Sequence, residues 1–175
     1  WLIKLGVDYS SLLHSEVTNA NNVFDVAKAL LSSKEIKLLI VDSIAALTPT
    51  VELEEEMEKQ NIGVLAKTVN KGLRVTNALN FRQGTAVVFI NQIRDRVGIM
   101  FGNPTTTPGG KGMKFFAAIR IEVKRGEWYP DKKNREGVEV VCKIVKNKTA
   151  TPYEEARFVL MNATGEIKEW SELDR

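Results

Sequence analysis

The stretch KLLIVD, Lys37 to Asp42, decides the fold class of this 175-residue chain. It is a continuous apolar run that ends in an acid, and such runs are typical of strands buried on both faces of a parallel sheet. A second run of this kind is TAVVFINQ, Thr85 to Gln92, which ends in two amide side chains. We therefore predict two fully buried strands with polar residues at their carboxyl ends.

Helical periodicity surrounds the first of these runs. Apolar residues recur at helical spacing from Asn22 to Ser32, and Asn21 or Asn22 can cap that helix. A longer helix is predicted from Ile62 to Leu79. Because helices and strands alternate in this half of the chain, an α/β fold is favoured.

Consecutive strands are predicted in the second half of the chain. The candidates run from Ala117 to Val123, from Val138 to Val145 and from Ala156 to Leu160, and residues 125–137 fit an exposed hairpin connection. Together with the first half, they predict a mostly parallel twisted sheet that becomes antiparallel at one edge. We expect one domain over residues 1–160 and a C-terminal extension or linker over residues 161–175.

Composition narrows the class of protein. The hydrophobic content is 43% and the longest apolar runs are too short to span a bilayer, so we expect a folded cytoplasmic protein with no membrane partner. The single cysteine, Cys142, cannot form an internal disulfide, and His14 is the lone histidine. Because Trp1, Leu2 and Leu5 already look like the middle of an amphipathic segment, we expect the chain to be a piece of a longer protein.

Charge is distributed unevenly along the chain. Residues 61–148 carry 17 basic and 6 acidic side chains, a net charge of +11, although the whole chain has a net charge of only +3. A solvated surface can explain part of this excess. A basic block around a glycine-rich loop more often faces a polyanion, and we therefore expect nucleic acid as a partner.

The polar ends of the two apolar strands are candidate nucleotide-binding residues. Ligands of open α/β sheets bind beyond the carboxyl ends of the strands. A carboxylate there, such as Asp42 beside Ser43, can hold the hydration shell of Mg²⁺. Gln92 could hydrogen-bond a γ-phosphate and pull on the loop that follows it. The alternative is that these residues only cap the strands.

The loop GIMFGNPTTTPGGKG, Gly98 to Gly112, is a candidate ligand-binding segment. It ends in Gly-Lys, but it is no phosphate-binding loop, because Thr105 and Gly112 stand where G-x-x-x-x-G-K-[ST] needs glycine and a hydroxyl residue. Its residue types suit the bases and phosphodiester chain of a nucleic acid instead, since they combine cations, apolar wedges and close backbone approach. The candidate DNA-binding residues are Arg94, Arg96, Met100, Phe101, Gly102, Asn103, Gly109, Gly110 and Lys111. The alternative is a structural loop that buries Phe101.

Two lysines follow the apolar run Val140 to Val145. Lys146 and Lys148 are two apart, so in a continuing strand both project to the same face while Asn147 points away. Two ammonium groups on one face repel each other unless an anion lies beside them. A solvated strand edge whose lysines discourage aggregation is the alternative.

Three segments resemble the bacterial RecA recombinases: LLIVDSIAALTP (Leu38 to Pro49), FINQIRDRVGIMFGNPTTTPGGKGMKFFA (Phe89 to Ala117) and KIVKNKTATP (Lys143 to Pro152). The resemblance implies a RecA-like P-loop NTPase core whose N-terminal part, with the P-loop and the catalytic glutamate, would precede Trp1. It also implies a DNA-dependent ATPase that uses ATP and Mg²⁺, forms filaments on single-stranded DNA and pairs it with homologous duplex. Roles in DNA repair and the SOS response would follow.

The resemblance also assigns roles to individual residues. Asp42 matches the Walker B aspartate, which holds Mg²⁺ through water, and Ser43 is its neighbour. Gln92 matches the glutamine that couples the γ-phosphate to the second DNA-binding loop, residues 93–110. Lys146 and Lys148 match lysines that reach ATP on the adjacent subunit. The remaining matches are an interface aromatic at Phe115, an adenine-stacking aromatic at Trp1 and a first DNA-binding loop at residues 52–63.

Because the sequence departs from the family pattern, two alternative functions stay open. The first loop is unusually acidic, and Pro108 and Lys111 replace residues that are usually threonine and asparagine. Without the P-loop segment, this chain alone is expected not to hydrolyse ATP. One rival is a non-catalytic DNA-binding or filament-regulating module. The other is a hexameric helicase-type ATPase, against which the second loop and the KNK motif speak.

Overall fold

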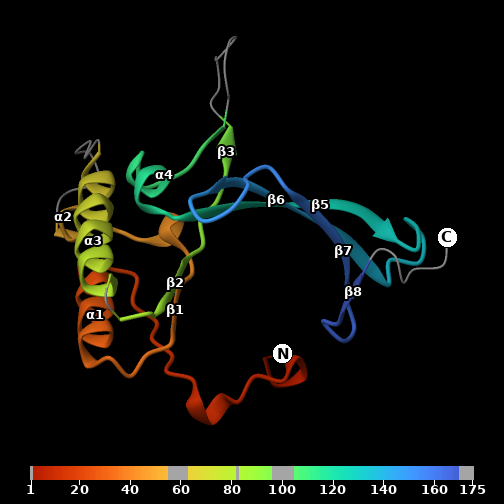
Figure 1. Ribbon diagram of the computed structural model, residues 1–175, viewed down its shortest axis with the longest axis horizontal. Helices are drawn as coiled ribbons and strands as arrows, with labels where there is room; N and C mark the ends of the chain where they lie inside the picture. Colours follow the sequence, from red (N-terminus) through yellow and green to blue (C-terminus); the bar gives the residue numbers. More distant parts are fainter. Residues whose placement is uncertain (1, 55–62, 82, 96–104, 170–175) are drawn as a thin grey trace. The chain divides into compact units, whose positions relative to one another are not determined.

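The computed structural model describes residues 2–54, 63–81, 83–95 and 105–169 (Figure 1). The chain divides into two compact units. One comprises Ser15–Phe116, and the other combines Trp1–His14 with Ala117–Arg175. In the described residues, no helix is both long and apolar enough to cross a membrane.

The unit Ser15–Phe116 is built on two parallel strands with helices beside them. Strand β1 (Leu38–Val41) pairs with β2 (Ala86–Phe89), so both apolar runs form strands as predicted. Helix α1 (Ala20–Ser33) packs along α3 (Val64–Asn80) (Figure 1). Shorter elements complete the unit: a 3-10 turn at Ile44–Ala46, α2 (Thr50–Glu54), β3 (Arg94–Asp95), β4 (Thr105–Thr106) and α4 (Gly112–Phe116).

Helix α1 begins two residues earlier than its apolar period predicts. The predicted caps, Asn21 and Asn22, are wrong, because Asn19 caps the helix and its Oδ1 accepts the backbone N–H groups of both residues. An asparagine outside the first turn is free to take the extended backbone that this cap requires. Phe24 is among the buried residues of this helix.

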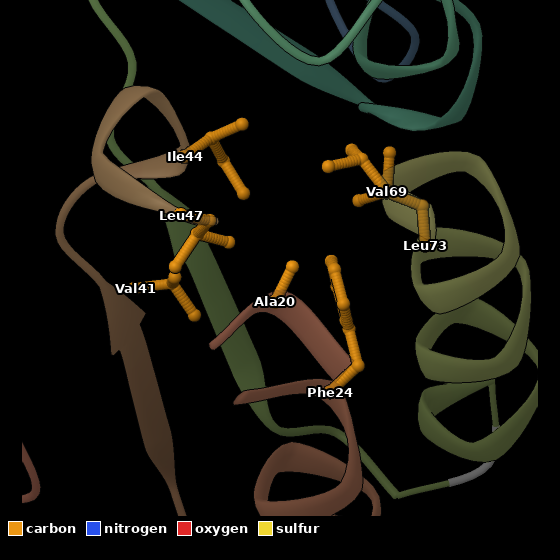
Figure 2. Packing of buried hydrophobic residues seen from close by; sticks show 7 residues of the cluster. All are labelled: Ala20, Phe24, Val41, Ile44, Leu47, Val69 and Leu73. Carbon is orange, nitrogen blue, oxygen red and sulfur yellow. The ribbon is translucent and has the colours of Figure 1, made fainter. Parts of the chain in front are cut away.

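The hydrophobic core of this unit lies between β1, α1 and α3. Figure 2 shows Phe24 of α1 directed toward Val69 and Leu73 of α3, with Val41 and Ile44 across from them. Ile44 and Val69 are fully buried. Partly buried Phe89 packs against the same cluster, so β1 and β2 both turn one face to the helices.

The opposite face of the β1–β2 pair is exposed, which corrects the expectation of strands buried on both sides. Leu38, Ile40 and Val88 are 55%, 53% and 43% exposed. They share one face because side chains alternate along strands and the register pairs Ile40 with Val88. The helices described in this unit cover only the other face, and the apolar run alone cannot reveal which faces have a covering layer.

Gly72 of α3 lies against Phe24 of α1. A Cβ at this position would collide with the ring of Phe24. We expect Gly72→Ala to lower the free energy of unfolding by about 1–3 kcal/mol, because overpacking outweighs the gain in helix propensity. Urea unfolding of the full-length protein measures this loss. Asn77→Ala, an exposed change on the same helix, is the matched control, and equal stabilities of the two variants would contradict the prediction.

The second unit contains a four-stranded antiparallel sheet. Its strands follow chain order: β5 (Ile119–Tyr129), β6 (Gly137–Asn147), β7 (Glu155–Met161) and β8 (Ile167–Glu169). All three predicted strands are confirmed. The expectation of a mostly parallel sheet is wrong for the described residues, where the parallel sheet has two strands and the antiparallel sheet four. The predicted boundary at residue 160 falls within β7, and β8 pairs with β7 beyond it.

The β5–β6 hairpin is longer than predicted, so its turn occupies only residues 130–136. Asp131 organises this turn by accepting the backbone N–H groups of Lys133 and Asn134. These hydrogen bonds, the one from Asn134 first, lower the pKa of Asp131. At the end of β5, the guanidinium carbons of Arg125 and Arg135 lie over the Trp128 ring, 3.8 Å and 5.1 Å from its centroid. Local polar contacts and this cation–π stack stabilise what composition alone predicts as a loop.

Candidate functional site

The carboxyl ends of β1 and β2 meet through backbone hydrogen bonds. The N–H of Ile90 donates to the carbonyl of Val41 at 2.9 Å, and the N–H of Ile44 donates to the carbonyl of Ile90 at 3.0 Å. These bonds bring Asp42 and Ser43 next to the residues that follow β2. The structure thus joins the two polar strand ends that the sequence singles out.

Asp42 is exposed and Ser43 is half-buried at this edge. The described residues contain no group of three or more His, Cys, Asp or Glu side chains that could hold a metal together. A lone exposed carboxylate fits Mg²⁺ held through water, because that ion keeps several waters and takes other ligands from phosphates. Asp42 therefore has the chemistry for one water-mediated contact to Mg²⁺.

Gln92 is exposed three residues after the end of β2, and its neighbour Asn91 bridges two segments. The Asn91 side-chain Oδ1 accepts the backbone N–H of Gln92 at 2.9 Å. Its Nδ2 donates to the carbonyl of Pro108, also at 2.9 Å and 17 residues away in the sequence. Sequence reasoning predicted a role for Gln92 and missed Asn91. The only signal was a second amide at the same strand end.

The loop after Gln92 returns on itself. Arg94 pairs with Thr106 and Asp95 with Thr105 in the short antiparallel β3–β4 ladder. Among the predicted site residues, Trp1, Arg96, Met100, Phe101, Gly102 and Asn103 lie outside the described residues, as do residues 55–62 of the first loop. Their roles stay predictions.

The glycines that end this loop pack on the core of the unit. Gly109 is buried at φ +81°, and a Cβ there would lie 2.9 Å from Ile44. Gly110, at φ +77°, faces Ala66 of α3 at 2.9 Å in the same sense. Lys111 is exposed at the following residue. The DNA-contact role expected of the two glycines stays a prediction, and their packing supplies a structural reason for glycine at both positions.

Three cations gather where β5 begins and β6 ends in the other unit, with Lys148 one residue beyond β6. Arg120 pairs with Lys146 across the two strands, and the N–H of Lys148 donates to the carbonyl of Ala118 at 3.0 Å. Directly paired residues share a face of the sheet, which places Arg120 beside Lys146. Burial, Lys148 and Arg120, in that order, lower the pKa of Lys146. An anion on this face would offset the repulsion between like charges.

Arg120 is a member of this cluster that sequence reasoning missed. It precedes Lys146 by a whole hairpin, and only the register of β5 against β6 places the two side by side. Phe115, the predicted interface aromatic, lies on α4 and is 70% exposed. An exposed aromatic of this size is compatible with a protein contact.

Two parallel strands with polar residues at their joined carboxyl ends are the arrangement in which open α/β folds bind their ligands. The family model of the RecA N-terminal domain matches residues 1–167. The chain belongs to the RecA family.

Curated relatives named Protein RecA agree with this assignment. The protein of Mycoplasma mycoides subsp. mycoides SC is 45% identical over 162 residues, which cover 93% of this chain and 47% of the relative. That of Mesoplasma florum is 45% identical over 152 residues, covering 87% and 46%. That of Mycobacterium marinum is 42% identical over 172 residues, covering 98% and 49%. The chain spans about half the length of these relatives.

Proposed function

We propose that the full-length protein is a cytoplasmic recombinase that assembles on single-stranded DNA with ATP and Mg²⁺ and exchanges strands with homologous duplex. The observation that carries this proposal is the junction at the strand ends, where Asp42 and Gln92 flank one edge and the loop proposed to bind DNA departs from it. Family membership supports the same reading. Roles in DNA repair and the SOS response belong to the proposal.

The nucleotide would be held at this edge by residues with separate tasks. Asp42 would hold Mg²⁺ through water, with Ser43 as its polar neighbour. The exposed Gln92 would lie beside the terminal phosphate. ATP supplies the free energy difference between two filament states when it is bound and hydrolysed. The phosphate cradle would come from a segment outside these 175 residues, because the Gly-Lys at residues 110–111 fails the P-loop spacing.

The other half of each nucleotide site would come from the next protomer. Lys146, Lys148 and Arg120 form a cationic cluster where β5 begins and β6 ends. Such a cluster suits the γ-phosphate of a nucleotide bound to the neighbouring protomer. An arginine finger supplied by a partner protein acts on a phosphoryl group in the same way. Phe115 would lie in the contact between protomers.

DNA binding by the loop can be tested with two single substitutions in the full-length protein. Phe101→Ala should weaken binding of single-stranded DNA about tenfold with an unchanged salt slope, since stacking is worth about 1–3 kcal/mol per base and releases no counterions. Arg94→Ala should flatten the salt slope by about one unit per lost phosphate contact. Fluorescence anisotropy across a salt series, with and without ATP, measures both.

Three results would count against the proposal. Unchanged affinity and equal salt slopes for both variants would return the loop to a structural role. DNA binding that ignores ATP, in a protein without ATPase activity, would favour the non-catalytic module. DNA-driven unwinding by closed rings instead of open filaments would favour the helicase-type ATPase.

A further inference from the structure

We propose that Asn91 is a positioning residue that couples the nucleotide-facing Gln92 to residues 105–108, the returning stem of the 93–110 loop. This inference rests on the proposed function. One side-chain amide joins the two segments. Its oxygen fixes the backbone N–H of Gln92, and its nitrogen fixes the carbonyl of Pro108.

The residues on either side make Asn91 a fixed point. Ile90, directly before it, has both backbone groups bonded, its N–H to Val41 and its carbonyl to Ile44. Asn91 is itself half-buried, whereas Gln92 directly after it is exposed. The amide therefore extends from an anchored strand end, and a movement of the Gln92 backbone must strain or break its bond to Asn91.

The segment held by the other end of the amide is anchored as well. Pro108 precedes Gly109 and Gly110, which lie against Ile44 and Ala66. Before it, Thr105 and Thr106 pair with the outgoing stem. The Asn91 side chain thus links Gln92, just before β3, to Pro108, just after β4. It joins the two ends of the segment whose strands pair in the β3–β4 ladder.

Only an amide side chain of this length satisfies both partners. Aspartate keeps an acceptor for the Gln92 N–H but presents a second acceptor to the Pro108 carbonyl, and alanine loses both bonds. Without these two hydrogen bonds, Gln92 can still contact a phosphate. A movement of Gln92 is then no longer transmitted through Asn91 to Pro108. The expected defect lies in coupling and leaves the binding of either ligand alone intact.

The test compares the affinity of full-length protein for fluorescent oligothymidylate with a slowly hydrolysed ATP analogue and with ADP. The ratio of the two dissociation constants reports coupling. Asn91→Ala should reduce this ratio about tenfold, the scale of one or two lost hydrogen bonds, while the affinity with ADP stays within about twofold. Asn91→Asp should behave alike, and Asn77→Ala on the exposed surface of α3 should match the parent.

A double-mutant cycle with Gln92→Ala separates coupling from a merely structural effect. If Asn91 acts through Gln92, adding Asn91→Ala to Gln92→Ala changes the ratio no further. Additive losses would overturn the inference, as would a parental ratio in Asn91→Ala, or equal weakening in both nucleotide states. A parent protein whose DNA affinity is the same with both nucleotides would instead overturn the proposed function.

Discussion

Changing both Lys146 and Lys148 to alanine is expected to reduce the DNA-dependent ATPase of the full-length protein by roughly a hundredfold or more. Cations that stabilise a transferring phosphoryl group from a neighbouring subunit contribute at least that much. Nucleotide binding by the isolated protomer should be unchanged, because on this proposal the two lysines serve the site of the adjacent one. Steady-state hydrolysis and nucleotide titration of the protomer measure the two quantities.

A complementation experiment makes this prediction specific. Asp42→Asn impairs the Mg²⁺-holding half of the site and leaves the lysines intact. Mixed filaments of the two variants contain interfaces with both intact halves, so some activity should return. Lys132→Ala with Lys133→Ala, two exposed lysines in the β5–β6 turn, is the charge-matched control. No recovery in filaments shown to contain both variants would contradict a site shared between protomers.

Gly109→Ala is expected to lower the free energy of unfolding by about 2–5 kcal/mol. A left-handed backbone costs a residue with a side chain about 1–2 kcal/mol. The new Cβ would also meet Ile44 at 2.9 Å and Val69 at 3.3 Å within the core, which adds about 1–3 kcal/mol of overpacking. Urea unfolding of the full-length protein, followed by far-UV circular dichroism, measures the change.

Gly84→Ala is the matched control for the backbone contribution. Gly84 has φ +68°, but a Cβ there would meet nothing within 4 Å. We expect this variant to lose about 1–2 kcal/mol, the backbone cost alone. Equal losses for Gly84→Ala and Gly109→Ala would show that the contact of Gly109 with the core has no energetic weight.

The local elements could be predicted because their signals are local. The apolar runs at residues 38–41 and 86–89 form the two parallel strands, and the periodic segments form α1 and α3. Alternating burial, helical spacing and turn residues depend on neighbours a few positions away, so the sequence carries them directly. The cap of α1 differs from prediction because the side-chain hydrogen bonds of Asn19 decide it, and β5 extends beyond its predicted end at Val123 to Tyr129.

The polar strand ends of the candidate site were also predictable from sequence. Asp42 and Gln92 follow apolar strands, and parallel strands bring their carboxyl ends to one edge. Candidate residues that are recognised by their type and their position at a strand end can therefore be identified from sequence alone. The pair Lys146 and Lys148 was identified on the same grounds.

What the sequence by itself determined is thus the set of elements and the residues at their ends, and tertiary structure decided which of them meet. Asn91 reaches Pro108 across 17 residues, Gly109 enters the core, and Arg120 joins Lys146 through strand register. The exposed face of β1 and β2 depends equally on which layers the chain supplies. These contacts arise from the registers and packing of segments distant in sequence, which no local period encodes.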